Sequence, residues 1–161
     1  MLRKTYKKLQ RRFERLPLHH IDTDILIEAL KETKLGNQCS DYLNRIGYKY
    51  RGVLSLSIIG EFFLVTFRDV KEQSIRDSGF EFIDRFIRRK KVGFSSLKYE
   101  NFRIIDKIKE IDSRIEDTDA VHLANCIQDK GDIFVTFDEK LVENSRLGKE
   151  FNMKLIHPES L

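Results

Sequence analysis

Apolar and polar positions follow one another along this chain in blocks whose spacing predicts strands and helices in turn. Short continuous apolar runs, such as IFVTF at 133–137, are typical of parallel strands that are buried on both faces. Longer stretches with an apolar side chain at every third or fourth position are typical of amphipathic helices. We therefore expect strands at 18–22, 52–57, 92–95, 132–137 and 153–157.

Helices are expected between these strands. Glycines at 47 and 131 mark the ends of two of them, and Asp117 or Thr118 can cap a third at its start. The alternation of strands and helices predicts an α/β fold, a three-layer α/β/α sandwich around a mostly parallel sheet. The expected helices cover residues 25–30, 36–46, 58–68, a long segment that ends near 91, 98–111, 118–130 and 139–147.

Length and composition fit one globular body. The chain has 161 residues, of which 40% are hydrophobic and 35% charged, enough to bury a core. Its two cysteines, Cys39 and Cys126, lack the spacing of a zinc site. No stretch approaches the about 20 apolar residues of a membrane span, and no signal peptide is apparent. We therefore expect a cytoplasmic protein without membrane association.

The charge is unevenly distributed. Residues 1–17 carry seven basic side chains and one acidic side chain, a net charge of +6, so the remainder carries −2. Apolar residues recur at spacings of three and four in this arm, which predicts a basic amphipathic helix over 1–17, ahead of the body at 18–161. Such segments either dock on the body with their charges solvated or contact nucleic-acid phosphates. The candidate phosphate contacts are Arg3, Lys4, Lys7, Lys8, Arg11 and Arg12 in the arm, and Arg88, Arg89 and Lys90 in a second cluster.

Four carboxylates lie in or beside apolar stretches: Asp22, Glu61, Asp119 and Asp138. A buried carboxylate is costly unless it is paired, and a divalent cation pairs with several at once. Parallel sheets bind ligands at the carboxyl ends of their strands. Asp22 and Asp138 end two predicted strands, so we expect the four acids to converge on one crevice.

Each acid also has a structural explanation. Asp22 and Asp117 could be helix N-caps, and Asp119 would be favoured by the helix dipole. Asp138 could be a turn residue. Glu61 is hardest to explain structurally, because residues 53–67 contain no other charged side chain.

The ordered set of motifs resembles the PIN-domain nuclease family. The resemblance rests on IDTDIL at 21–26, on Glu61 after SLS at 55–57, on DAVHLA at 119–124 and on FVTFD at 134–138. It covers the chain from about residue 18 to 161 and leaves the basic arm unexplained. It implies a commonly dimeric α/β/α nuclease that cuts RNA with Mg²⁺ or Mn²⁺, similar to the VapC toxins, whose partner is an antitoxin protein.

The resemblance also implies roles for particular residues. Asp22, Glu61, Asp119 and Asp138 take the places of the family's catalytic and metal-binding quartet, and Thr136 matches a hydroxyl residue that supports it. Asp24 stands where the family more often has Asn or Ser, which leaves open whether it binds metal directly or through water. His122, one helical turn after Asp119, could reach the site, although packing within its helix is the favoured interpretation.

Two alternatives to an RNA-cleaving enzyme remain at this point. Asp22 and Asp24 superficially resemble the nucleophile motif of aspartyl phosphatases, in which Asp22 would form a covalent phosphoryl intermediate. Ile25 and Leu26 then stand where that motif expects Thr or Val. The basic arm would also suit a catalytically silent RNA-binding subunit, although its acidic centre would repel RNA without a metal.

Overall fold

The strands form one parallel sheet in the order β3-β2-β1-β4-β5. The structure, a computed structural model, describes residues 9–90 and 92–160. All of the strands predicted from the sequence are present, each slightly shorter than expected. Their bounds are β1 Leu18–Ile21, β2 Arg51–Ser55, β3 Gly93–Ser95, β4 Ile133–Val135 and β5 Lys154–Ile156.

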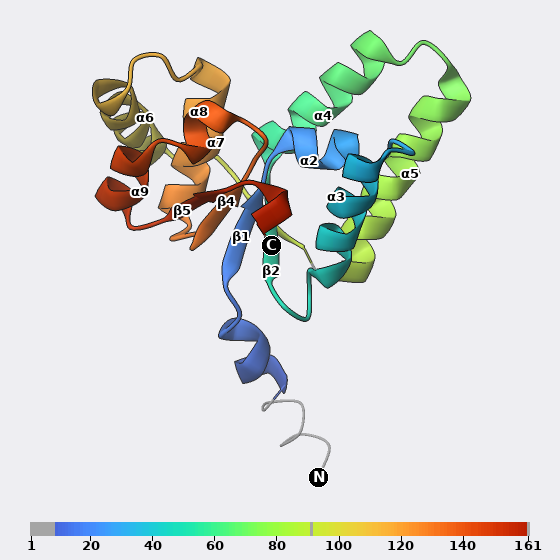
Figure 1. The fold of residues 1–161 in the computed structure, drawn as a ribbon, viewed down its shortest axis with the longest axis horizontal. Helices are drawn as coiled ribbons and strands as arrows, with labels where there is room; N and C mark the ends of the chain where they lie inside the picture. Colours follow the sequence, from blue (N-terminus) through green and yellow to red (C-terminus); the bar gives the residue numbers. More distant parts are fainter. Residues whose placement is uncertain (1–8, 91, 161) are drawn as a thin grey trace.

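Helices flank the sheet on both sides (Figure 1), which confirms the predicted α/β class. Helices α2 to α5 cover one face of the sheet and pack mainly against β1 and β2. Helices α6 to α9 cover the other face and pack mainly against β4 and β5. Their bounds are α2 Thr23–Glu28, α3 Lys34–Arg45, α4 Leu56–Asp69, α5 Gln73–Lys90, α6 Tyr99–Ile111, α7 Asp117–Gln128, α8 Glu139–Val142 and α9 Ser145–Phe151, followed by a short 3-10 helix, η1, at Pro158–Ser160.

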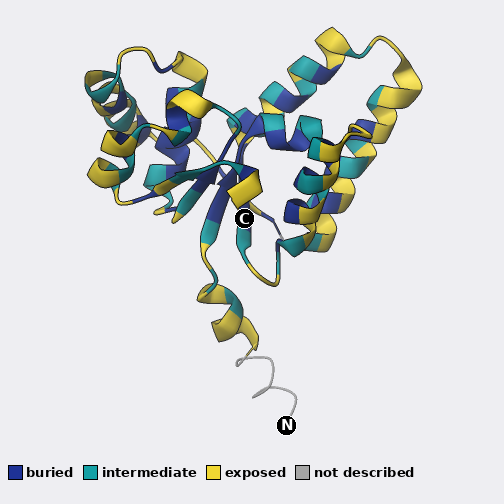
Figure 2. Ribbon diagram, in the orientation of Figure 1, coloured by how far each residue is buried: buried dark blue, intermediate teal, exposed yellow. Residues whose placement is uncertain are grey.

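Strand β1 lies in the interior, between the two helical layers. Successive residues of a strand point to opposite faces, and both faces of β1 are covered. His19 contacts the Tyr42 hydroxyl of α3 at 3.1 Å, whereas His20 lies 3.2 Å from Asp129 at the end of α7. Figure 2 shows the central strands β1, β2 and β4 as largely buried, with exposed residues on the outer helix faces, in loops and towards the ends of the chain.

Two expectations about helix ends are wrong. The helix predicted over 139–147 is two helices, because the Asn144 side chain accepts a hydrogen bond from the Leu147 N–H and so starts α9 afresh. Helix α7 is not capped by Asp117 or Thr118. Its N-cap is Glu116, and Asp117 turns outward to pair with Lys109 at 2.7 Å.

The described part of the basic arm is helical at 9–14 and extends from the amino end of β1 (Figure 1). Arg11 and Arg12 are exposed on it, whereas Arg3, Lys4, Lys7 and Lys8 lie outside the described residues. Leu9, which belongs to the predicted apolar stripe, is 60% exposed. Within 9–90 and 92–160, no helix combines the length and apolar character needed to cross a bilayer.

Candidate active site

The order of the strands creates a crevice at the carboxyl ends of β1 and β4. From β1 the chain passes to β2 on one side, whereas from β4 it passes to β5 on the other. Such a reversal leaves a gap between the helices that follow the two strands, and ligands of open α/β sheets bind there. Asp22 follows β1 directly, and Asp138 lies just beyond β4. The topology therefore brings two of the predicted acids to the same edge of the sheet.

Asp22 is held at this edge by two backbone contacts. Its N–H donates to the Val135 carbonyl at 3.0 Å, which extends the pairing of β1 with β4. Its carboxylate Oδ1 accepts the Thr23 N–H at 2.8 Å and caps α2. The side chain is nevertheless 7% exposed. Asp22 is thus both a helix cap and a buried carboxylate at the crevice.

Glu61 approaches Asp22 from the second turn of α4. Ser55 caps this helix through the Ile58 N–H, so α4 begins directly after β2 and carries Glu61 to the crevice. The Thr23 hydroxyl donates to Glu61 Oε2 and fixes its orientation. Thr23 was not identified from the sequence, although its place between Asp22 and Asp24 is the signal that could have indicated it.

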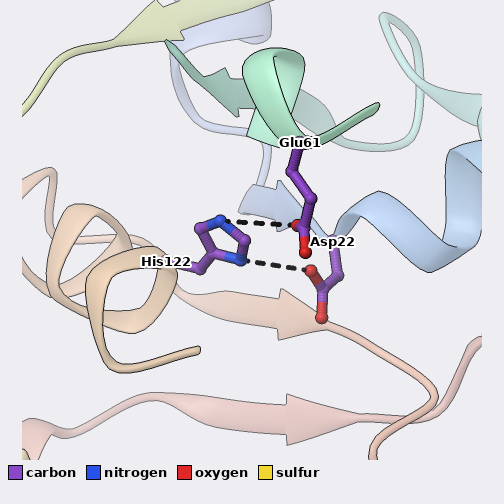
Figure 3. A group of neighbouring side chains, drawn as sticks. All are labelled: Asp22, Glu61 and His122. Carbon is purple, nitrogen blue, oxygen red and sulfur yellow. Dashed lines mark ion pairs between the residues drawn. The ribbon is translucent and has the colours of Figure 1, made fainter. Parts of the chain in front are cut away.

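The His122 ring faces both of these carboxylates from α7 (Figure 3). Its Nδ1 is 3.5 Å from Asp22 Oδ1, and its Nε2 is 3.7 Å from Glu61 Oε2. One potential metal-ligand atom from each of the three residues lies within 4.8 Å of the corresponding atoms of the other two. His122 is buried in α7, as a packing role requires, yet both ring nitrogens face the acids. The one-turn spacing from Asp119 was the sequence signal for this position.

Asp119 and Asp138 line a common pocket beside this group, together with Arg114 and Lys140. Burial, followed by the charges of Asp22 and Asp138, raises the pKa of Asp119 to about 6. Asp119 therefore lies near enough to Asp22 and Asp138 to be affected by their charges.

The loop after β4 orients Asp138. The Asp138 N–H donates to the Thr136 hydroxyl at 3.0 Å, and Asp138 Oδ1 accepts the Lys140 N–H at 2.8 Å as the cap of α8. Thr136 is fully buried. It therefore contacts the backbone of the acid, as a supporting residue would.

Asp24 joins the first helix of the site to the same loop. Its Oδ2 accepts the Phe137 N–H at 2.9 Å. Its Oδ1 is buried and has no hydrogen-bond partner among the described residues. Burial, and next the charge of Asp22, raises the pKa of Asp24 to about 7. Asp24 is thus a partly unsatisfied carboxyl at the margin of the group.

The site has the composition of a divalent-metal site. Carboxylate oxygens are the donors that Mg²⁺ and Mn²⁺ prefer, and several converge here. Asp24 Oδ1 and His122 Nδ1 are both buried without a hydrogen-bond partner in the described chain, which is costly in a protein without a ligand. The residues present therefore fit such an ion.

The second basic cluster lies at the amino ends of the strands, opposite the carboxyl ends where the acids lie. Arg88, Arg89 and Lys90 end α5, just before the chain enters the amino end of β3. Lys90 donates to the Asn44 carbonyl, and Arg88 pairs with Asp84. The arm leads into the amino end of β1, at the same end of the sheet (Figure 1). The described parts of both predicted phosphate-binding segments therefore lie away from the carboxylates.

The family model for the PIN domain matches residues 20–147. The match spans most of the chain, from β1 to α9, and so includes the elements on both sides of the crevice. The chain belongs to the PIN domain family, as its motifs indicated. Among curated proteins, no sequence matches it.

Solved structures share this fold at low sequence identity. The chain is similar to VapBC2 from Rickettsia felis, bound to a DNA fragment from their promoter, with 14% identity, a TM-score of 0.64 and coverage of 87% of this chain and 98% of that one. For FitAcB from Neisseria gonorrhoeae the values are 13%, 0.66, 89% and 99%. For VapC20 from Mycobacterium tuberculosis, described as a sarcin-ricin loop cleaving toxin, they are 11%, 0.57, 75% and 90%.

Proposed function

We propose that the chain is a metal-dependent endoribonuclease that hydrolyses phosphodiester bonds of RNA. The observation that carries this proposal is the group of Asp22, Glu61 and His122 at the carboxyl end of β1, with Asp119 and Asp138 lining a pocket beside it. Membership of the PIN domain family supports nuclease activity. The structural likeness to a toxin described as cleaving the sarcin-ricin loop supports RNA as the substrate class.

Asp22, Glu61, Asp119 and Asp138 would hold Mg²⁺ or Mn²⁺, with Asp24 as a further ligand. The bound ion would supply a Lewis acid that activates water and offsets the charge of the phosphate. The chain's own contribution is orientation: Thr23 fixes the Glu61 carboxylate, and Thr136 fixes the backbone at Asp138. Asp119, with a pKa of about 6, is mostly ionised at neutral pH and so available as a ligand.

Cleavage of RNA by matched variants tests this function. With Mg²⁺ or Mn²⁺ present, Asp22→Asn and Asp119→Asn should each lose more than about 100-fold of the rate, since loss of outer partners of a metal site alone costs about 10- to 100-fold. Asp117→Asn is the control, because Asp117 shares α7 with Asp119 but is exposed and pairs with Lys109. Equal cleavage by all four proteins would remove these acids from catalysis.

We further propose that the protein is a cytoplasmic, homodimeric toxin that is inhibited by an antitoxin protein. The description of VapC20 as a toxin supports this role. Helices α4 and α5 expose Leu64, Phe67 and Ile75, and exposed apolar groups of this kind are typical of protein interfaces. Sedimentation of the purified chain tests the dimer. Co-expression with the product of a neighbouring reading frame, followed by a cleavage assay, tests inhibition.

A phosphatase mechanism makes the opposite prediction at Asp22. It requires a covalent phosphoenzyme, lost in Asp22→Asn, after incubation with a small phosphate ester. The metal-hydrolysis proposal expects no such adduct, because the carboxylates bind and orient rather than attack. A trapped adduct on Asp22 would therefore replace the proposed mechanism.

A further inference from the structure

His122 has an environment that packing alone does not explain. The residue is 3% exposed, and its Nδ1 has no hydrogen-bond partner in the described part of the chain. A buried polar atom left unsatisfied costs about 1–3 kcal/mol. The ring is nevertheless oriented with one nitrogen toward Asp22 and the other toward Glu61 (Figure 3). This orientation indicates that something not present in the chain satisfies it.

The distances around the ring favour a shared cation over direct hydrogen bonds. Separations of 3.5 Å to Asp22 and 3.7 Å to Glu61 are long for charge-assisted hydrogen bonds. Ligand atoms about 2.1 Å from one metal lie about 3.0–3.4 Å from their neighbours. One ring nitrogen of His122 and one carboxylate oxygen each of Asp22 and Glu61 lie within 4.8 Å of one another, so rotations of these side chains would bring the three atoms to that spacing.

The surrounding elements hold the ring and the acids in place. His122 stands in the middle of α7 and is followed by the buried Leu123 and Ala124, which are 1% and 0% exposed. Glu61 is fixed by the Thr23 hydroxyl, and Asp22 by the Val135 carbonyl. The three donors therefore come from three separate elements, each held by contacts of its own. Such pre-organisation is typical of a binding site.

We propose that His122 is a metal ligand, and that with Asp22 and Glu61 it forms a mixed nitrogen and oxygen site that selects Mn²⁺ over Mg²⁺. The inference rests on the proposed function, to which it adds a ligand and a metal preference. Mg²⁺ binds oxygen donors almost exclusively, whereas imidazole nitrogen suits transition metals. A purely acidic site would discriminate less between the two ions.

Pulsed electron paramagnetic resonance of the Mn²⁺-loaded protein tests this directly, without reference to cleavage. A directly bound imidazole should produce a nitrogen coupling to Mn²⁺, and this coupling should change when the histidines are labelled with ¹⁵N. His122→Gln should abolish it while Mn²⁺ remains bound. His157→Gln is the matched control, since His157 is one of the four histidines and lies next to Glu159; it should retain the coupling.

Calorimetric titration gives the second readout. The ratio of the Mg²⁺ and Mn²⁺ dissociation constants should fall by about tenfold or more in His122→Gln and stay unchanged in His157→Gln. The labelled wild-type chain alone decides the case if the variant fails to fold. No bound Mn²⁺, bound Mn²⁺ without an imidazole coupling, or a coupling that persists in His122→Gln would each overturn the proposal.

The two proposals can fail separately. Acid-dependent RNA cleavage by a chain whose Mn²⁺ shows no nitrogen coupling would leave the nuclease in place and remove His122 from the metal. A nitrogen coupling in a chain that cleaves no RNA would leave the metal site and remove the nuclease.

Discussion

Asp22 combines two roles that its sequence presents as alternatives. It caps α2 through the Thr23 N–H and, with the same carboxylate, faces His122. A carboxylate has room for several partners, so local stabilisation of a helix and participation in a site do not exclude each other. At Asp117 the opposite occurred: the expected cap is an exposed partner of Lys109.

Asp24 should make the stability of the metal-free protein depend on pH. Its pKa is raised to about 7, so the folded state keeps a proton that the unfolded state loses near pH 4. The folded state therefore binds more protons between these values, and stability should fall as pH rises through this window. In EDTA, the wild type should lose more unfolding free energy between pH 5 and pH 8 than Asp24→Asn does.

Comparing the wild type with Asp24→Asn cancels the contribution of other titrating groups to the pH dependence of stability. His19, whose pKa burial lowers to about 4, acts in the opposite direction, because acid favours its protonation in the unfolded state. This contribution is common to both proteins and cancels in their difference. Parallel pH profiles in chemical denaturation would show that Asp24 does not hold its proton.

Thr136 should act through Asp138 rather than on the substrate. Its hydroxyl accepts the Asp138 N–H, so Thr136→Val should disorder the acid and lower the cleavage rate by about tenfold. Thr136→Ser restores the hydroxyl and should retain most of the rate. The rates are measured at saturating metal, alongside thermal denaturation. A loss in Thr136→Ser but not in Thr136→Val would indicate that the methyl group, not the hydroxyl, matters.

At the scale of elements, Gly131 was predicted to end α7 because glycine suits the left-handed conformation at a helix end. The structure gives it a different role. Helix α7 ends at Gln128, and the left-handed residue after it is Lys130, with φ of 55°, rather than the glycine. Gly131 instead allows a close approach. A Cβ there would lie 2.6 Å from Cys126 Sγ and 3.0 Å from His20 Cδ2.

Substitution of two glycines by alanine should therefore have opposite effects. Gly131→Ala should destabilise the protein by about 1–3 kcal/mol through overpacking. Gly60→Ala should stabilise it by about 0.5–1 kcal/mol, because Gly60 is an exposed position of α4 whose added Cβ meets nothing within 4 Å. Urea denaturation of both variants measures the effects. If Gly131→Ala left the free energy of unfolding unchanged, α7 and β1 would have to be able to move apart.

At the scale of the molecule, the carboxylates lie at the carboxyl ends of the strands, and the described residues of the basic segments lie at the amino ends. Two basic side chains, Arg114 and Lys140, line the pocket with Asp119 and Asp138. Positive charge beside a phosphate site guides the substrate. We therefore expect Lys140, rather than the cluster that ends α5, to contact the RNA close to the cleaved bond.

Affinity for RNA in a non-cleaving Asp22→Asn background tests this placement. Lys140→Ala should weaken binding several-fold and reduce the dependence of log affinity on log salt by about one. Arg88→Ala should change both by less, since Arg88 is already paired with Asp84. Fluorescence anisotropy over a range of salt concentrations provides the measurement. The reverse order would place the RNA at the amino ends of the strands.

The sequence by itself determined the alternation of strands and helices, the α/β class and the identity of the candidate acids. Hydrophobic periodicity and isolated charges are local properties, so IFVTF at 133–137 and Glu61 could be read directly. Tertiary structure decided what these residues contact. Strand order, which depends on long-range pairing, placed Asp22 and Asp138 at the same end of the sheet and the described basic residues at the opposite end. Side-chain packing across α4, α7 and β1, which no local pattern encodes, brought Thr23 to Glu61 and the His122 ring to two carboxylates.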